Sequence, residues 1–213
     1  KLSAEGDSEE FARTVRGGLT SALLIVIPIM SAAFVLAGEG VSILYLRGKF
    51  TPEDAANTTA ALLPILAAMP FFGVTELFSR MFYSKGEVKL PMLAALTGIA
   101  CNALSGAVLV NLGLCGISAV GIANAAGQIA SAAFLLVSAA KRIPGLMDRR
   151  FLIDILKLVL GGVLVFAVCV LIKAVIGSDP FASSFFTNVV KAMVIFLPSA
   201  VIYVVYAKLV KLF

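Results

Sequence analysis

The sequence predicts an all-α polytopic membrane protein with six transmembrane helices. The chain of 213 residues is 61% hydrophobic and only 14% charged, with a mean hydropathy of +1.06, whereas soluble domains carry about a quarter charged residues. Six apolar stretches reach the roughly 20 residues that a helix needs to cross a bilayer, and they alternate too little for the strands of a membrane barrel. The stretches are residues 18–46, 57–79, 90–111, 116–140, 152–177 and 186–207.

The basic residues give these spans an orientation. Outside the spans they fall mainly before the first span, in the second and fourth loops and in the tail, whereas the opposite loops offer only Arg47 and Lys49. Because Lys and Arg accumulate in cytoplasmic loops, both ends of the chain are expected to be cytoplasmic. The same residues meet anionic lipid headgroups, so the net charge of +5 does not indicate nucleic-acid binding. Lys157, Lys173 and Lys191 lie within span ends, where lysines snorkel to the interface.

The first element, residues 1–17, is predicted to be a cytoplasmic linker with a short interfacial helix over 8–17. Asp7 or Ser8 is placed to cap this helix, and Glu10 stands three residues after Asp7 as in a capping box. The helix leads through Gly17 and Gly18 into the first span. With no initiator Met, the chain is expected to be a piece of a longer protein.

Two acidic residues inside the first two spans are candidates for a transport cavity, because a central charge costs at least about 2.5–3.5 kcal/mol on insertion. Glu39 lies eight residues before Arg47, or roughly 12 Å along a helix. It therefore either faces a water-filled cavity or is capped by a neighbouring helix, and the glycines on both sides suggest local unwinding. Glu76 precedes Arg80 by four residues, the favourable order for a helical ion pair. A partly buried structural pair is the simpler interpretation there.

The second span has a well-specified start. Thr51 is placed as the N-cap, Pro52 takes the first helical position, and Glu53 and Asp54 put two acids in the first turn, where they complement the helix dipole.

Polar amides mark the third and fourth spans. Asn102 lies in the third span, and Asn124 and Gln128 lie one turn apart in the fourth, with a tight turn at Gly113 that should bring the two faces together. Hydrogen bonding between helices is the ordinary use of such residues in membranes. A cation site is the sharper alternative, although no carboxylate stands beside them.

The fifth and sixth spans contain small residues and a helix breaker, namely Gly161, Gly162 and Pro198. Such residues allow either close packing of helices or bending during transport.

The sequence offers almost nothing from which to build an enzyme. It contains no histidine, no glycine-rich phosphate loop and no nucleophile beside a plausible base. Its cysteines, Cys101, Cys115 and Cys169, have no paired spacing. We therefore expect neither catalysis nor a cofactor.

Several motifs resemble those of the MurJ (MviN) lipid II flippase family. The block 36–39 followed by 47–51 resembles "LAEPI…LLFGRGAFT", residues 80–91 resemble "AFYALGDTRTPV", and Asn102 followed by 113–124 follows "N…LG…G.ALAT". The resemblance covers essentially the whole chain. It implies the last six of fourteen helices in a two-bundle exporter fold, with residues 18–140 as four helices of the second bundle, 141–151 as a cytoplasmic loop and 152–213 as a C-terminal pair.

That resemblance also implies a function, which is moving lipid II from the cytoplasmic to the outer leaflet of the bacterial inner membrane by alternating access. Glu39, Glu76 and Arg80 become cavity candidates, and Gly161, Gly162 and Pro198 become candidates for a groove that takes the polyprenyl tail. The family's cation site matches Asn102, Val120 and Asn124 in part, but Gly106 stands where an acid is expected. The expected partners are lipid II, membrane lipids and the rest of the transporter before residue 1. A polysaccharide-lipid or multidrug exporter of the same superfamily, and a scaffold without transport activity, are the alternatives.

Overall fold

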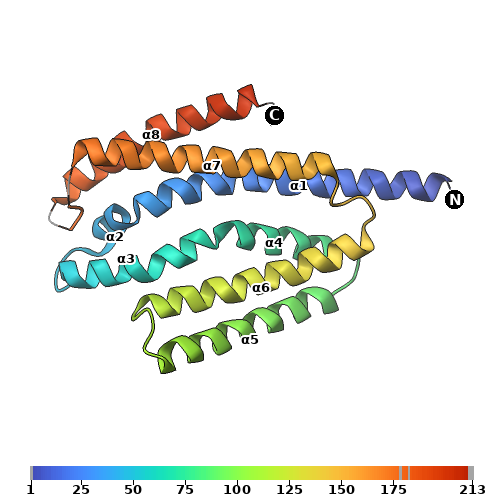
Figure 1. Ribbon diagram of the computed structural model, residues 1–213, viewed down its shortest axis with the longest axis horizontal. Coiled ribbons are helices and arrows are strands. Elements are labelled where there is room, and N and C mark those ends of the chain that lie inside the picture. Colours follow the sequence, from blue (N-terminus) through green and yellow to red (C-terminus); the bar gives the residue numbers. More distant parts are fainter. Residues whose placement is uncertain (1, 178, 182, 211–213) are drawn as a thin grey trace.

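The computed structural model consists of helices joined by short connections (Figure 1). It describes residues 2–177, 179–181 and 183–210, with side chains from Glu9 onward, and this part of the chain has no strand. Five helices are long and apolar enough to cross a membrane, and the bent pair α3 and α4 makes a sixth span. The predicted all-helical, multi-pass fold is therefore confirmed. The helices are α1 (Leu2–Val35), α2 (Ala37–Tyr45), α3 (Pro52–Ala67), α4 (Met69–Ser84), α5 (Lys89–Asn111), α6 (Ser118–Arg142), α7 (Arg149–Ile176) and α8 (Phe185–Leu209).

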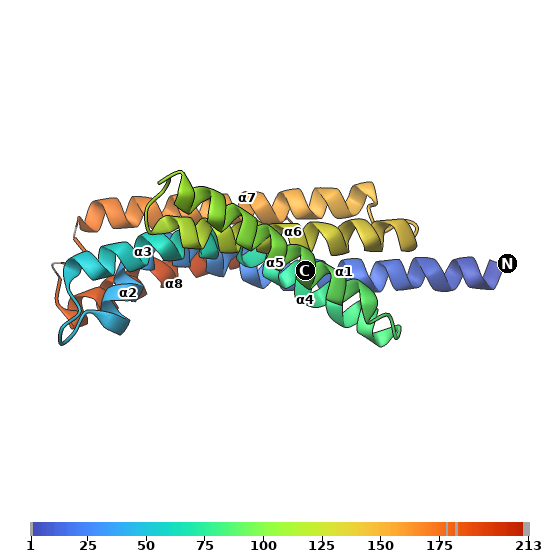
Figure 2. The same ribbon diagram turned by 90° about the horizontal axis from the view of Figure 1, so that it is seen from below.

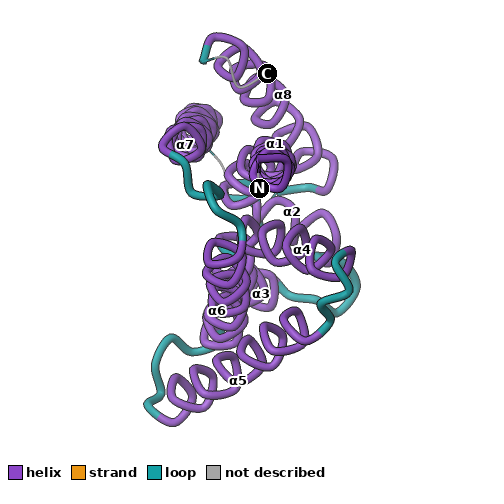
Figure 3. The backbone as a smooth tube through the Cα atoms, turned by 90° about the vertical axis from the view of Figure 1, so that its right-hand side faces the viewer, coloured by secondary structure: helices purple, strands orange, loops and turns teal. Residues whose placement is uncertain are grey.

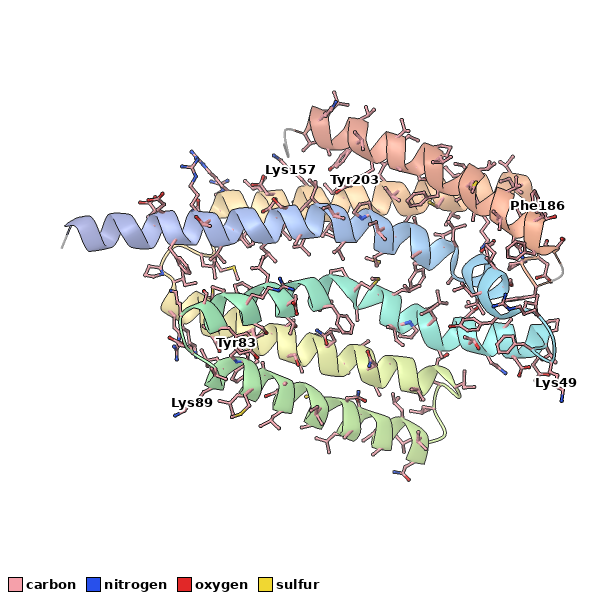
Figure 4. The ribbon with its side chains drawn as sticks, turned by 180° about the vertical axis from the view of Figure 1, so that it is seen from behind. Lys49, Tyr83, Lys89, Lys157, Phe186 and Tyr203 are labelled. Carbon is pink, nitrogen blue, oxygen red and sulfur yellow. The ribbon has the colours of Figure 1, made fainter. Side chains whose placement is uncertain are left out.

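The helices form a curved row, which Figure 3 shows end-on from α8 and α7 through α1 to α4, α3, α6 and finally α5. Helix α1 joins the two halves of the row, because it packs against α7 and α8 on one side and against α3 and α4 on the other. The axes of the long helices are roughly aligned with one another (Figure 2). We call the end with α2 and the α7–α8 connection the α2 end, and the end with the α4–α5 and α6–α7 connections the terminal end. Lys49 marks the former and Lys89 the latter in Figure 4.

The main core lies where α1 meets α4, α6 and α7. Phe78 of α4, Leu135 of α6 and Leu158 of α7 are completely buried in it. The buried residues of α1 recur every three or four positions, so that a single stripe of the helix faces its neighbours. They are Ala12, Val15, Leu19, Leu23 and Ile27.

This stripe corrects the prediction of a separate interfacial helix over 8–17. Helix α1 begins at Leu2 and continues through Gly17 and Gly18 to Val35, so Asp7 does not start a helix. Each glycine inside a helix costs only about 1 kcal/mol. Burial of an uninterrupted apolar face that starts at Ala12 outweighs that cost, because each fully buried aliphatic side chain contributes about 1.5–3 kcal/mol.

The first two spans are each divided, whereas they were predicted as single helices over 18–46 and 57–79. The first breaks at Leu36, between α1 and α2. The second bends by 45° between α3 and α4. Pro70 has no N–H to donate to the carbonyl of Leu66, and at the bend the N–H of Ala68 is shared between the carbonyls of Pro64 and Ile65 at 3.2 and 3.1 Å. Loss of a helical hydrogen bond at proline is an ordinary cause of such a kink.

The predicted start of the second span is confirmed. The Thr51 hydroxyl accepts a hydrogen bond from the N–H of Asp54 at 3.2 Å, and the Asp54 carboxylate accepts one from the N–H of Thr51 at 2.9 Å. Pro52 is the first helical residue. This reciprocal capping box satisfies two backbone donors that would otherwise lack partners.

Candidate functional site

The α2 end contains a buried ion pair at the break between α1 and α2. Glu39, in the first turn of α2, is only 1% exposed. The ammonium of Lys173, near the end of α7, lies 2.8 Å from one carboxylate oxygen of Glu39 and 2.9 Å from the other. It also donates a hydrogen bond to the carbonyl of Val35 at 2.8 Å. Of the two settings open to Glu39 from the sequence, a cavity or a cap from a neighbouring helix, the structure therefore has the second.

The α7–α8 connection closes over this pair. A Cβ atom added at Gly38 would lie 3.1 Å from Cγ of Pro180, so the connection rests directly on the first turn of α2. The Asn188 side chain, 1% exposed, holds the connection in place by donating to the carbonyl of Pro180 at 2.8 Å. The ion pair is therefore covered by the C-terminal hairpin on the side of α2.

A second irregular point of α1 is satisfied by the same hairpin. Pro28 lacks the N–H that would otherwise bond to the carbonyl of Leu24. The hydroxyl of Tyr203, on α8, donates to that carbonyl at 2.9 Å, and Figure 4 labels this residue. Neighbouring helices commonly replace the bonds that proline removes in a membrane span. Side chains from α7 and α8 thus bind two carbonyls of α1 that lack a helical donor, that of Leu24 opposite Pro28 and that of Val35 at the break.

An apolar groove of about 570 Å³ runs between α1 and α8, with Val165 of α7 at its base. Its walls include Leu24, Ile29 and Ala32 of α1 and Phe196, Ala200 and Tyr203 of α8. A second apolar groove of about 440 Å³ lies between α1, the α3–α4 bend and α7. Both grooves have the apolar walls and the size that suit a hydrocarbon chain.

The predicted groove residues occupy three different settings. Gly162 lines the second groove, and a Cβ there would lie 2.5 Å from Cγ2 of Ile27. Gly161 faces α8 instead, where an added Cβ would come within 2.8 Å of the Tyr206 ring. Both glycines therefore permit close helix packing, a role that small residues commonly have in membranes. Pro198 is exposed on α8 and is not among the residues that line either groove.

Glu76 and Arg80 form the ion pair that their spacing predicts, but the pair is not buried. The guanidinium Nε of Arg80 donates to the Glu76 carboxylate at 2.7 Å. The side chain of Arg80 is 79% exposed and that of Glu76 is 64% exposed. Both charged groups are therefore accessible from the open side of α4.

The amides of α5 and α6 come together as predicted, around a small pocket of about 270 Å³. Asn102, Asn124 and Gln128 all line it. Gln128 donates to the hydroxyl of Thr75 on α4 at 3.0 Å, which is the interhelical hydrogen bonding expected of such residues. The side-chain oxygen of Asn124 is buried and has no partner among the described residues.

This pocket does not fit the expected cation site. Val120 is 67% exposed and is not among its lining residues. The residues that line it, within the described part of the chain, include no carboxylate, and Gly106 offers no side-chain ligand in its place. A cation taken from water needs several oxygen ligands and favours at least one with a negative charge.

Sequence reasoning missed the partner of Glu39. Lys173 was assigned to the interface because of its place near a span end, and it lies 134 residues from Glu39 along the chain. The one signal in the sequence was that an unpaired acid and an unpaired base both stood inside spans near the same predicted side of the membrane. Nothing in the sequence indicated that Tyr203 donates a hydrogen bond to the carbonyl of Leu24.

Comparisons with known proteins agree with this architecture. The family model described as "Lipid II flippase MurJ" matches residues 1–191. A probable lipid II flippase MurJ of Aquifex aeolicus is 33% identical over 90 residues, or 42% of this chain and 18% of the relative. Those of Bdellovibrio bacteriovorus and Thermotoga maritima are 27% and 26% identical over 74% and 76% of this chain, and the matches cover 30% and 34% of those proteins.

A solved structure shares the fold. It is titled as the lipid II flippase MurJ in an inward closed conformation, and it superposes with a TM-score of 0.71 over 96% of this chain and 41% of its own, at 23% identity. The chain thus spans about a third or less of the curated relatives named above. Since the family model matches most of the chain, this multi-pass membrane protein belongs to the lipid II flippase MurJ family.

Proposed function

We propose that this chain is the C-terminal portion of a lipid II flippase, a transporter rather than an enzyme, that moves the lipid-linked peptidoglycan precursor from the cytoplasmic to the outer leaflet by alternating access. The observation that carries the proposal is the family match over residues 1–191. The remaining helices of the transporter would supply the other wall of the cavity, a division that agrees with the 41% coverage of the solved relative.

The groove between α1 and α8 supports a lipid as the cargo. A polyprenyl tail is a long hydrocarbon chain, and burying it in an apolar groove is favourable in water and neutral in lipid. The lining of the groove is almost wholly apolar, although Thr20 and Ser21 lie at the terminal end of its α1 wall. We assign the tail to this groove, with Gly161 and Gly162 setting how closely α7 approaches its neighbours.

The positions of the basic residues support an orientation with both ends of this segment in the cytoplasm of a bacterial cell. Arg142 at the end of α6 pairs with Glu87 of the α4–α5 connection, and Arg16 lies 3.4 Å from Asp148. Basic residues from several loops therefore lie at the terminal end, as they do at the cytoplasmic face of an inner-membrane protein. The α2 end then faces the outer leaflet.

Glu76 and Arg80 remain candidates for the transport cavity because both side chains are open. Glu39 has a different place in the proposal. Its carboxylate is occupied by Lys173 and is enclosed by α7 and α8, so we assign it to the framework of the transporter and not to the cargo.

The test is exposure of lipid II at the outer leaflet in cells depleted of the full-length protein and then complemented with it. Restored exposure would support the flippase. A matched control is a full-length protein with Leu171→Ala, since Leu171 is 65% exposed on α7 and lines neither groove. This variant should complement fully.

Normal lipid II exposure during depletion, in a strain without a redundant flippase, would refute the proposal. Sensitivity to toxic cations with normal lipid II exposure would instead indicate a multidrug exporter, and accumulation of another lipid-linked glycan would indicate a polysaccharide-lipid exporter. If no transported compound changed, the result would favour a scaffold.

A further inference from the structure

The C-terminal pair α7–α8 does more in this fold than form one wall of a groove. Helix α1 has two points where a backbone carbonyl loses its helical partner, at Leu24 opposite Pro28 and at Val35 where α1 ends. An unpaired carbonyl away from water is costly. At both points a side chain of the pair supplies the missing donor, Tyr203 at 2.9 Å and Lys173 at 2.8 Å.

The contact at Lys173 also compensates a charge. Glu39 is 1% exposed, and its carboxylate oxygens lie 2.8 and 2.9 Å from the ammonium. A carboxylate buried in this way depends on its partner, because removing one member leaves the other charged and without solvent. The side chain of Lys173 is 29% exposed, whereas that of Glu39 is only 1% exposed, so the carboxylate is the member of the pair that depends more on its partner.

These contacts join elements that belong to different parts of the fold. Helices α1 and α2 connect directly to α3 and pack against it, and thus to the half of the row that contains α4, α5 and α6. Helices α7 and α8 form the opposite edge of the row (Figure 3). The direction in which α2 leaves α1 therefore depends on side chains that come from the far edge.

We propose that Lys173 and Tyr203 are positioning residues that clamp α1 at its two irregular points, so that docking of the C-terminal pair sets the angle between α1 and α2 and keeps the α2 end closed. Lys173 closes the break at Leu36 and neutralises Glu39, and Tyr203 holds α1 beside Pro28. The consequence for transport rests on the proposed function, since it makes release of this clamp part of opening toward the outer leaflet. The clamp itself does not depend on the identity of the cargo.

The experiment measures how accessible α2 is from outside. Ser42 lies on α2, three residues after Glu39, and is 5% exposed. In the full-length protein with its other reactive cysteines replaced, Ser42→Cys is labelled in intact cells by a membrane-impermeant maleimide. Of the cysteines in this segment, the exposed Cys115 is replaced by Gly, which suits its φ of 65°.

Two pairs of matched variants separate the clamp from general damage. Lys173→Met removes the ammonium at the break, and Lys157→Met removes an ammonium from the other end of the same helix, where the side chain is 32% exposed and its partners are Asp154 and a carbonyl of the tail. Tyr203→Phe deletes only the hydroxyl that reaches α1. Tyr206→Phe deletes a hydroxyl that bonds within the pair, to the carbonyl of Lys157 at 2.8 Å.

The clamp predicts that the cysteine at position 42 is labelled about tenfold faster in Lys173→Met than in the parent, equivalent to about 1.4 kcal/mol in the opening equilibrium. Tyr203→Phe should change the rate in the same direction by a smaller factor. Lys157→Met and Tyr206→Phe should match the parent, and Lys173→Arg should restore protection because it keeps a charged donor. A merely structural loss of stability would not be rescued selectively in this way.

Equal labelling of Lys173→Met and the parent would overturn the proposal, and so would equal acceleration by Lys157→Met. Should Lys173→Met fail to reach the membrane, the double variant E39Q/K173M removes both charges and leaves none unpaired, and protection of position 42 in that variant would also overturn the clamp. Lipid II exposure is then measured in the same strains. If the parent does not support lipid II exposure, the proposed function fails, whereas the labelling still decides whether the clamp exists.

Discussion

A close approach of two helices gives a prediction with a calculable size. Helices α5 and α6 meet at Gly98 and Gly127, and a Cβ added at Gly127 would lie 2.6 Å from the carbonyl oxygen of Gly98 and 2.9 Å from Cβ of Asn102. Neither atom can rotate away, so Gly127→Ala must push the helices apart. The separation would also stretch the hydrogen bond that Ser131 donates to the carbonyl of Ala94 at 2.9 Å.

The expected net cost is about 2 kcal/mol. Overpacking contributes about 1–3 kcal/mol and the weakened hydrogen bond about 1 kcal/mol, against a gain of about 1 kcal/mol in helix propensity. Gly106→Ala is the matched control on α5, because its Cβ would meet only Cβ of Ala123 at 3.4 Å. That variant keeps the propensity gain and should be as stable as the parent or slightly more stable.

The assay is the apparent Tm of the full-length protein in detergent, read as the fraction that remains monodisperse after heating. At about 2–4 °C per kcal/mol for an unfolding unit of 150–250 residues such as this segment, Gly127→Ala should melt about 4–8 °C below the parent. If Gly127→Ala and Gly106→Ala melted together, the reasoning from close backbone contact would be wrong, and these glycines would have to be explained by flexing.

Three further predictions use the same preparations. Thr51→Ala removes the capping box and should cost about 1 kcal/mol, whereas Thr51→Ser should not; equal melting of the two would contradict the role of the hydroxyl. Arg80→Ala breaks only an exposed pair worth less than about 1 kcal/mol, so its Tm should stay within about 2 °C of the parent, while a cavity role for the Glu76 pair predicts reduced lipid II exposure at normal abundance. Gly161→Trp should clash with the Tyr206 ring and reduce lipid II exposure, whereas Leu171→Trp, exposed on the same helix, should not. Full exposure in Gly161→Trp would show that transport does not depend on this close packing of α7 and α8.

Features that depend on neighbouring residues could be predicted from the sequence. The six spans follow from apolar length alone, and their ends agree with the helices to within a few residues at α5 and α8. The cap at Thr51 needs only residues within one turn. The contact of the amides on α5 and α6 was predictable because a tight turn joins the two helices, so that their facing residues are fixed by the connection.

The sequence contains a pattern that predicts one continuous helix α1, but Gly17 and Gly18 were interpreted as a boundary between two helices. The stripe from Ala12 to Ile27 has helical spacing across Gly17 and Gly18, which indicates one helix and not two. A possible capping box at Asp7 is a local signal, and such signals give way when a longer apolar face can be buried. At Leu36 no proline marks the break, and the glycines beside Glu39 were the signal of local unwinding in that region.

The partner of Glu39 shows how depth in the membrane can replace sequence distance as a criterion. Glu39 precedes Arg47 of the α2–α3 connection by eight residues and Lys173 precedes Gly177 by four, so at about 1.5 Å per residue they lie roughly 12 and 6 Å from the same end. The long side chain of lysine spans that difference, and the break at Leu36 lets Glu39 turn toward it. Two opposite charges at similar depth, each too costly to bury alone, predict contact between their helices. Assigning Lys173 to the interface by itself discarded that constraint, and with it a long-range ion pair that joins the C-terminal pair to the break between α1 and α2.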